Sequence, residues 1–173
     1  MTSLETIIQI IITDDHQMFI DGLKLVLSKE EKIKVIGEAS NGQQLLFLLR
    51  QRKPDILLLD INMPKMDGFE VMQNIQKSFS DIKVIVITTY TDYQLILKLK
   101  KLGIRGFVVK TASSEELLES IQTVSDGKEY FHTDILNIMK QKQEESNHYD
   151  NFIQKYKLTP REIDILKLVV QGY

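Results

Sequence analysis

The sequence contains no cysteine, and only 3 of its 173 residues are proline. The absence of cysteine excludes disulfide bonds, thiolate metal sites and cysteine nucleophiles. It also fits a reducing compartment, so we expect a cytoplasmic protein. Hydrophobic residues make up 43% and charged residues 27% of the chain, close to the averages for globular proteins, so the chain is expected to fold.

An excess of charge of either sign is also missing, since the net charge is -2 and the pI is about 5.9. Without a globally basic surface, any binding to nucleic acid would need a local basic patch. Long hydrophobic runs are missing too. Residues 7–12 are interrupted by Gln9 and followed by Thr13, Asp14 and Asp15. This run is too short for a signal peptide or a membrane span, so we expect no membrane partner.

An alternation of strand and helix patterns fills the first 127 residues. The predicted strands are residues 7–12, 34–39, 55–60, 83–88 and 104–110, and the predicted helices are residues 19–27, 43–50, 69–79, 93–102 and 115–124. Residues 56–59 and 84–87 are apolar throughout, which is typical of strands covered on both faces. We therefore predict an α/β fold with a five-stranded, doubly wound parallel sheet in the order 2-1-3-4-5.

Helix-end signals support this division of the chain. Asn41 can cap the second predicted helix, and Ser113 or Ser114 can cap the fifth with a Glu shortly after it. Gly103 and Gly127 stand where two of the helices are expected to stop.

The pattern changes after residue 127. Residues 128–157 contain no glycine or proline and are mostly polar, so we predict a helical linker with a flexible middle. Thr159 and Glu162, on either side of Pro160 and Arg161, form a capping-box signature that starts a new helix, for which Gly172 can be the C-cap. A single amphipathic helix cannot bury its apolar face alone. We therefore expect residues 158–173 to be the truncated start of an all-α domain, following a domain at 1–127.

Polar side chains stand at the ends of four of the five predicted strands: Asp14 and Asp15, Asp60, Thr88 and Lys110. The carboxyl ends of parallel strands meet at one edge of the sheet, so we expect these groups to converge. Three carboxylates repel one another and need cationic compensation, which Mg²⁺ can provide beside the lysine. A carboxylate that attacks phosphorus becomes an acyl phosphate. Each residue alone would be an ordinary strand end; together they indicate a site.

Four motifs in the first 127 residues resemble the receiver domain of two-component response regulators. They are Asp14-Asp15, Asp60-Ile-Asn-Met-Pro64 with Asp67-Gly68, Val86-Ile87-Thr88, and Gly106-Phe-Val-Val-Lys110. Residues 158–162, Leu-Thr-Pro-Arg-Glu, resemble the start of a LuxR-type helix-turn-helix. Together the motifs resemble the NarL/FixJ class. The resemblance implies a flavodoxin-like receiver followed by a truncated DNA-binding domain, in a protein that regulates transcription.

The resemblance also implies the reaction and the switch. Asp60 would accept a phosphoryl group from a sensor histidine kinase, Lys110 would neutralise that group, and Thr88 would move to bind it. Phe107, where relatives frequently have Tyr, would turn inward behind Thr88 as the switch aromatic. Ordinary core packing is the alternative for Phe107.

The metal ligands follow from the same resemblance. Asp15, Asp60 and the main-chain oxygen of Asn62 would bind Mg²⁺ directly, and Asp14 would bind it through water. His16 lies beside the acidic pair and could suggest a metal ligand. A single histidine at a helix start is, however, expected to be exposed or to cap the helix.

Two other functions stay open from the sequence. A haloacid-dehalogenase-type phosphatase also places an Asp after a strand, but it usually has a second Asp two positions on, where this chain has Asn62. We therefore expect no enzyme. A phosphorelay or protein-interaction module without DNA binding is the second alternative. The family's recognition helix would lie beyond Tyr173, so we expect this chain to bind DNA weakly or not at all, and phosphorylation could make it a homodimer.

Overall fold

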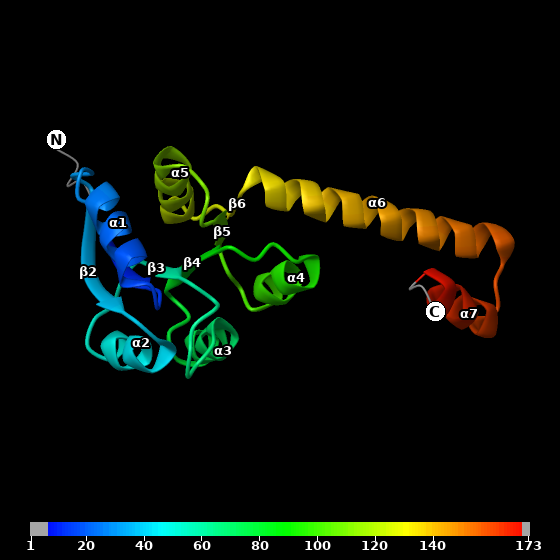
Figure 1. Cartoon of the computed structure of the whole chain (residues 1–173), viewed down its shortest axis with the longest axis horizontal. Helices are drawn as coiled ribbons and strands as arrows, with labels where there is room; N and C mark the ends of the chain where they lie inside the picture. The colour runs from blue at the N-terminus through cyan, green and yellow to red at the C-terminus, as the bar shows by residue number, and fades with distance from the viewer. Residues whose placement is uncertain (1–6, 171–173) are drawn as a thin grey trace. The chain divides into compact units, whose positions relative to one another are not determined.

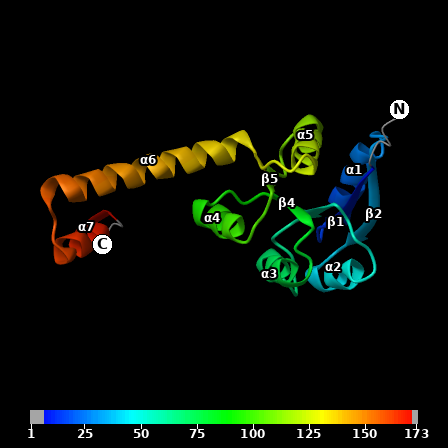
Figure 2. The ribbon, with the colours of Figure 1, turned by 180° about the vertical axis from the view of Figure 1, so that it is seen from behind.

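The computed structural model describes residues 7–170, and for residues 149, 152 and 166–170 it describes the backbone only. The chain divides into two compact units, Met1–Ile135 and Leu136–Tyr173, which are treated separately below. Figure 1 labels the helices and strands along the chain, and Figure 2 shows them from behind. Among the described residues, no helix is both long and apolar enough to cross a membrane.

The first unit is built on a parallel sheet of six strands in the order β2-β1-β3-β4-β5-β6. The strands are β1 (Ile8–Thr13), β2 (Ile33–Ala39), β3 (Ile56–Leu59), β4 (Lys83–Thr88), β5 (Gly106–Val109) and β6 (Tyr130–Phe131). The predicted order of the first five strands is confirmed. The predicted number is wrong by one, because β6 lies in the segment predicted to be a helical linker with a flexible middle. A strand of two residues is too short to show a period in the sequence.

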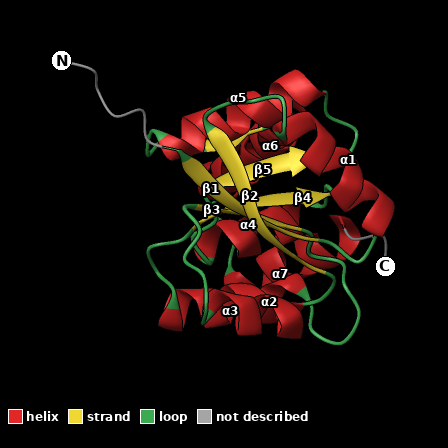
Figure 3. Cartoon of the chain, turned by 90° about the vertical axis from the view of Figure 1, so that its left-hand side faces the viewer, coloured by secondary structure: helices red, strands yellow, loops and turns green. Residues whose placement is uncertain are grey.

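Helices cover both faces of this sheet (Figure 3). They are α1 (Gln17–Leu27), α2 (Gly42–Leu49), α3 (Gly68–Ser78), α4 (Tyr93–Lys101) and α5 (Ser114–Ser125). Helices α1 and α5 lie on one face, and α2, α3 and α4 lie on the other. Every residue of β3 is buried, as its continuous apolar sequence predicted. One large core cluster joins β1, β3 and β4 to the apolar sides of α1 and α5, through Ile12, Leu23, Leu58, Ile87 and Ile121 among others.

The predicted helix ends are confirmed. The Asn41 side chain accepts a hydrogen bond from the Gln44 amide at 3.0 Å and so caps α2. Ser113 and Glu116 form the capping box of α5, in which each side chain accepts from the other residue's main-chain N–H. Gly103 and Gly127 end α4 and α5 with φ of 83°, a left-handed conformation that glycine adopts without steric cost.

The second unit contains most of α6 (Thr133–Tyr156) and α7 (Pro160–Val170). The segment predicted as a helical linker therefore consists of β6 and one continuous helix. Helix α7 begins at the predicted proline, and Glu162 Oε2 accepts hydrogen bonds from the main-chain N and the hydroxyl of Thr159, at 2.8 and 2.7 Å. The predicted cap at Gly172 lies outside the described residues. The domain boundaries at 127 and 157 stay a prediction.

Candidate functional site

Two buried carboxylates lie side by side at the carboxyl edge of the sheet. Strands β1 and β3 pair so that Thr13 is opposite Leu59. The next residue after each strand is an aspartate, Asp14 after β1 and Asp60 after β3. The Asp60 amide donates to the Thr13 carbonyl at 2.8 Å, which fixes the two strand ends to each other. Asp14 is only 2% exposed and Asp60 3%. Unpaired carboxylates would be costly at this depth, so a positive partner is required.

Lys110 is that partner. Its Nζ lies 2.6 Å from Asp14 Oδ2 and 2.7 Å from Asp60 Oδ2, and its side chain is 14% exposed. Burial by itself lowers the pKa of the Lys110 ammonium. Hydrogen bonds to Asp14 and Asp60, together with the charges of these carboxylates, outweigh burial and raise the pKa above its ordinary value. The lysine is therefore charged at neutral pH and joins the ends of β1, β3 and β5.

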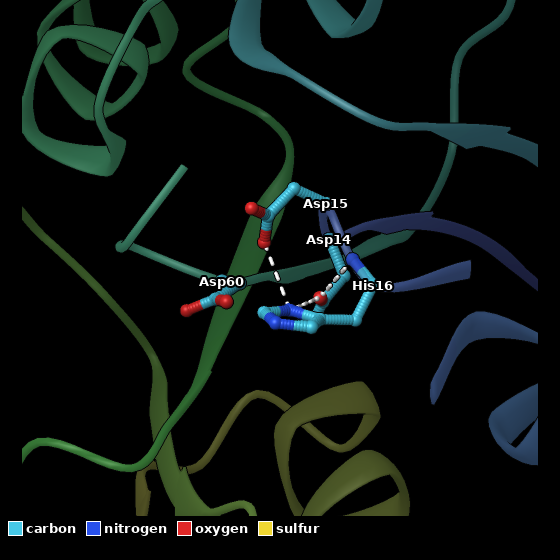
Figure 4. Close-up of side chains that lie close together, drawn as sticks. All are labelled: Asp14, Asp15, His16 and Asp60. Carbon is cyan, nitrogen blue, oxygen red and sulfur yellow. Dashed lines mark hydrogen bonds and ion pairs between the residues drawn. The ribbon is translucent and has the colours of Figure 1, made fainter. Parts of the chain in front are cut away.

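Asp15 and His16 form the outer part of the cluster (Figure 4). The His16 Nδ1 lies 2.9 Å from Asp15 Oδ1 and 3.1 Å from Asp14 Oδ1, and the His16 amide donates to the same Asp14 oxygen at 2.9 Å. His16 is the residue before α1, yet its side chain makes no capping hydrogen bond. It is 66% exposed, as expected, but it contacts two of the acids.

The loop after β3 is folded tightly over Asp60. The main-chain N–H of Asn62 donates a hydrogen bond to Asp60 Oδ1 at 3.1 Å, and the Lys110 ammonium contacts Asp60 Oδ2. Both carboxylate oxygens of Asp60 therefore have a partner. The Gly68 amide closes the loop by donating to the Ile61 carbonyl at 3.0 Å. Gly68 approaches so closely that a Cβ there would lie 2.5 Å from the Ile61 Cα. Lys65 completes the turn with φ of 73°.

A cavity of about 620 Å³ adjoins Asp60. Its lining residues are His16, Met18, Phe19, Asp60, Asn62, Thr89 and Lys110. The buried carboxylate and its lysine partner thus both face an open space, through which a ligand can reach Asp60.

Thr88 and Phe107 lie on one face of the sheet. Strands β4 and β5 pair Val86 with Phe107 and Thr88 with Val109, and residues two apart on a strand share a face. Thr88 and Phe107 are therefore diagonal neighbours. Both are fully buried. The Thr88 hydroxyl accepts from the Tyr90 amide at 3.2 Å and is not among the groups that hold Asp60.

The donor set fits a hard divalent cation. Asp14, Asp15, His16 and Asp60 each offer one ligand atom, and these atoms lie within 4.8 Å of one another. Three carboxylates in this space carry more negative charge than one ammonium can balance. Carboxylate oxygen is the ligand that Mg²⁺ prefers, with water completing the shell, so the acidic pocket suits this ion.

Comparisons with known proteins agree with this geometry. The model of the response regulator receiver domain matches residues 10–122. The chain belongs to the response regulator receiver family. It is 30% identical to the transcriptional regulatory protein DegU of Brevibacillus brevis, over 98% of this chain and 77% of that protein. It is 29% identical to the response regulator VraR of Staphylococcus aureus, over 96% of this chain and 77% of that protein.

Solved structures confirm the fold of this response regulator. The receiver domain of NarL from Mycobacterium tuberculosis superposes with a TM-score of 0.68 at 27% identity, over 71% of this chain and 99% of that chain. The resemblance to NarL/FixJ response regulators drawn from the motifs is therefore confirmed, as is the receiver fold.

The structure brings together most of the residues that the sequence singled out in this response regulator. Asp14, Asp15, Asp60 and Lys110 form one cluster, and Asn62 contacts Asp60 through its main chain. Sequence reasoning missed the contact of Lys110 with an aromatic ring. The Lys110 Nζ lies 4.7 Å from the centroid of the Phe19 ring. No sequence signal pointed to it, because Phe19 fits the apolar side of its helix equally well.

Proposed function

We propose that Asp60 accepts a phosphoryl group from a sensor histidine kinase and that this modification controls a DNA-binding output. The contact of Lys110 with Asp60 and Asp14 carries the proposal. It places a fixed positive charge beside a buried carboxylate at the wall of an open cavity. Transition states of phosphoryl transfer spread negative charge over the transferred oxygens, so a positioned cation is what the reaction needs.

The proposed transfer forms one bond to phosphorus and breaks one. One Asp60 carboxylate oxygen forms a new bond to phosphorus while the bond from phosphorus to the histidine nitrogen of the donor breaks, and the electron pair of that bond stays on the nitrogen. The product is an acyl phosphate. The Lys110 ammonium then exchanges its contact with the carboxylate for a contact with a phosphoryl oxygen. The Asn62 amide keeps the acceptor carboxylate oriented through its 3.1 Å hydrogen bond.

Mg²⁺ would be held by the carboxylates of Asp15 and Asp60 and by the main-chain oxygen of Asn62, and Asp14 would act on it through water. The ion, when bound, neutralises charge on the phosphoryl oxygens. His16 contacts Asp14 and Asp15 from the exposed side, so its imidazole must give way where it competes with the ion for Asp15.

The switch uses Thr88 and Phe107. When the phosphoryl group forms, the Thr88 hydroxyl leaves the Tyr90 amide and donates a hydrogen bond to a phosphoryl oxygen. Phe107 lies diagonally beside it on the same face of the sheet and moves into the space released. Such a change alters the α4 and β5 side of the domain, and the altered surface is the output signal.

Transcriptional control is supported by α7 and by the relatives. Helix α7 starts at Pro160 after a contact between Thr159 and Glu162, as the helix-turn-helix motif implied, and DegU is named a transcriptional regulatory protein. We propose that DNA binding belongs to an output domain of which residues 158–173 are a part. The cytoplasmic location and the phosphorylation-dependent homodimer stay predictions.

Intact mass tests the central assignment. The protein is incubated with Mg²⁺ and acetyl phosphate, and the same is done with Asp60→Ala and, as a control, with Asp81→Ala, which removes a carboxylate that is 75% exposed. The parent and Asp81→Ala should gain the mass of one phosphoryl group, which is lost in alkali as expected of an acyl phosphate, and Asp60→Ala should gain none. A parent without this adduct, or an Asp60→Ala variant that still carries it, would overturn the assignment.

A further inference from the structure

Lys110 has a second contact that the proposed reaction does not use. Its ammonium lies over the Phe19 ring, 4.7 Å from the centroid. A cation over the face of an aromatic ring is attracted by the ring's negative face, and the attraction grows when water is excluded. The Lys110 side chain is only 14% exposed, so the contact is partly shielded from water although both residues line the open cavity at Asp60.

The position of the Phe19 ring is fixed by the fold. Phe19 lies in the first turn of α1, where its amide donates to the His16 carbonyl at 3.0 Å, and its side chain packs against the core shared by α1 and α5. The ring therefore follows the backbone that carries the acidic pair. Phe19 and Lys110 both line the cavity at Asp60 and a second cavity of about 270 Å³ between α1 and α5. The ring and the lysine therefore lie together between the two cavities.

This contact differs from the others that hold Lys110. In the structure the ammonium is held by Asp14 and Asp60, the carboxylates that a divalent cation and a phosphoryl group would engage. When the phosphoryl group reaches Asp60, the long and flexible lysine has to exchange its contact with the Asp60 carboxylate for one with a phosphoryl oxygen. The face of Phe19 carries no oxygen, so neither the ion nor the phosphoryl group competes for it.

We infer that Phe19 is a positioning residue for phosphoryl transfer, whose ring face keeps the Lys110 ammonium at Asp60 while the lysine exchanges the carboxylate for the phosphoryl group. The inference rests on the proposed function of Asp60. Phe19 does not touch the reacting atoms and acts through the lysine. A ring that only filled the core would be replaceable by any side chain of similar size.

Substitution at position 19 separates these roles. Phe19→Leu removes the ring face, and Phe19→Tyr retains it. Incorporation of 3,4,5-trifluorophenylalanine at position 19 keeps the shape and weakens the negative face of the ring. Phe69→Leu is the matched control, because Phe69 is also partly buried, its ring centroid lies 5.6 Å from the Lys98 ammonium, and it is not among the residues that line the cavity at Asp60.

The rate of phosphorylation by acetyl phosphate at saturating Mg²⁺ should fall about fivefold in Phe19→Leu and in the trifluorinated protein, a loss within the range for a desolvated cation–π contact. Phe19→Tyr and Phe69→Leu should stay near the parent rate. Mg²⁺ affinity, measured by calorimetry, should change by less than about twofold in all four. The methylene protons next to the Lys110 ammonium should lose their ring-current shift in Phe19→Leu, as seen by NMR.

Three results would overturn the inference. A trifluorinated protein as fast as the parent would show that the ring acts only by its shape, even if Phe19→Leu failed to fold. A Phe19→Tyr variant as slow as Phe19→Leu would show that packing decides the rate. A parallel loss of Mg²⁺ affinity would place the effect on the metal ligands. Failure of the proposed function is distinct, because the parent itself would then gain no phosphoryl group at Asp60.

Discussion

Gly68→Ala should destabilise the receiver and slow its phosphorylation, because the acceptor loop and the start of α3 touch at this residue. An added Cβ would lie 2.5 Å from the Ile61 Cα, whereas carbon atoms in ordinary contact are about 3.5 to 4.0 Å apart. The obstacle is main chain, so either the loop or the helix start must move by about 1 Å. Overpacking of this kind costs about 1 to 3 kcal/mol.

Helix α3 resists such a movement. Asp67 Oδ1 accepts from the amides of Phe69 and Glu70, both at 2.9 Å, so the first turn is tied to the residue before the glycine. The strain should therefore pass to the loop that carries Asn62, whose amide orients Asp60. A displacement of about 1 Å at a reacting group can slow a reaction by up to about a hundredfold, and we expect about a tenfold slower phosphorylation.

The matched control is Gly22→Ala in α1. Nothing lies within 4 Å of a Cβ added at Gly22, and alanine in a helix interior is better than glycine by about 0.5 to 1 kcal/mol, so this variant should be more stable than the parent. Thermal unfolding followed by circular dichroism measures both variants. At about 4 °C per kcal/mol, the Tm should fall by about 8 °C for Gly68→Ala and rise by about 3 °C for Gly22→Ala. A Gly68→Ala variant as stable as the parent would refute the reasoning.

Two further outcomes follow from the charges. Lys110→Met leaves the two buried carboxylates without their ammonium, so their negative charge should attract Mg²⁺ more strongly. Calorimetry should show Mg²⁺ binding roughly tenfold tighter than in the parent and in the control Lys98→Met. Unchanged or weaker binding would contradict this. A hydrogen bond from the Ser113 amide holds the pKa of the Glu116 carboxyl below its ordinary range, so the stability it gives is present above the unfolded-state pKa and is lost as the pH falls through the lowered value. The parent should therefore be more stable than Glu116→Gln at pH 7, and this difference should shrink as the pH falls below the ordinary glutamate pKa of about 4.3. Glu119→Gln should follow the parent, and equal acid unfolding curves for the parent and Glu116→Gln would contradict this.

The strands and the acid cluster could be predicted because their signals are local. Continuous apolar runs such as residues 56–59 specify buried parallel strands, and the residue that follows each strand is then placed at a known edge. Asp14, Asp60 and Lys110 thus become neighbours once the strand order is known. The same is true of the helix ends at Asn41 and Ser113, where one side chain and one amide suffice.

Other contacts depend on packing between elements and left no pattern in the sequence. The face of Phe19 meets Lys110 only because α1 and β5 place them together. His132 Nε2 lies 3.0 Å from Glu116 Oε1, and its Nδ1 accepts from the Asp134 amide at 3.3 Å, so it joins the start of α5 to the start of α6. A histidine and a glutamate that are sixteen residues apart in the sequence give no reason to expect a pair.

Strand β6 has a consequence for how copies of the receiver can associate. A sheet edge offers unpaired N–H and C=O groups, to which a strand of another chain can add. The two residues of β6 pair with Gly106 and Phe107, and α6 begins two residues after β6 ends. The edge that remains on this side is too short to template a further strand. Self-association there has to use side chains, whose contacts can be strengthened or broken without unfolding the sheet.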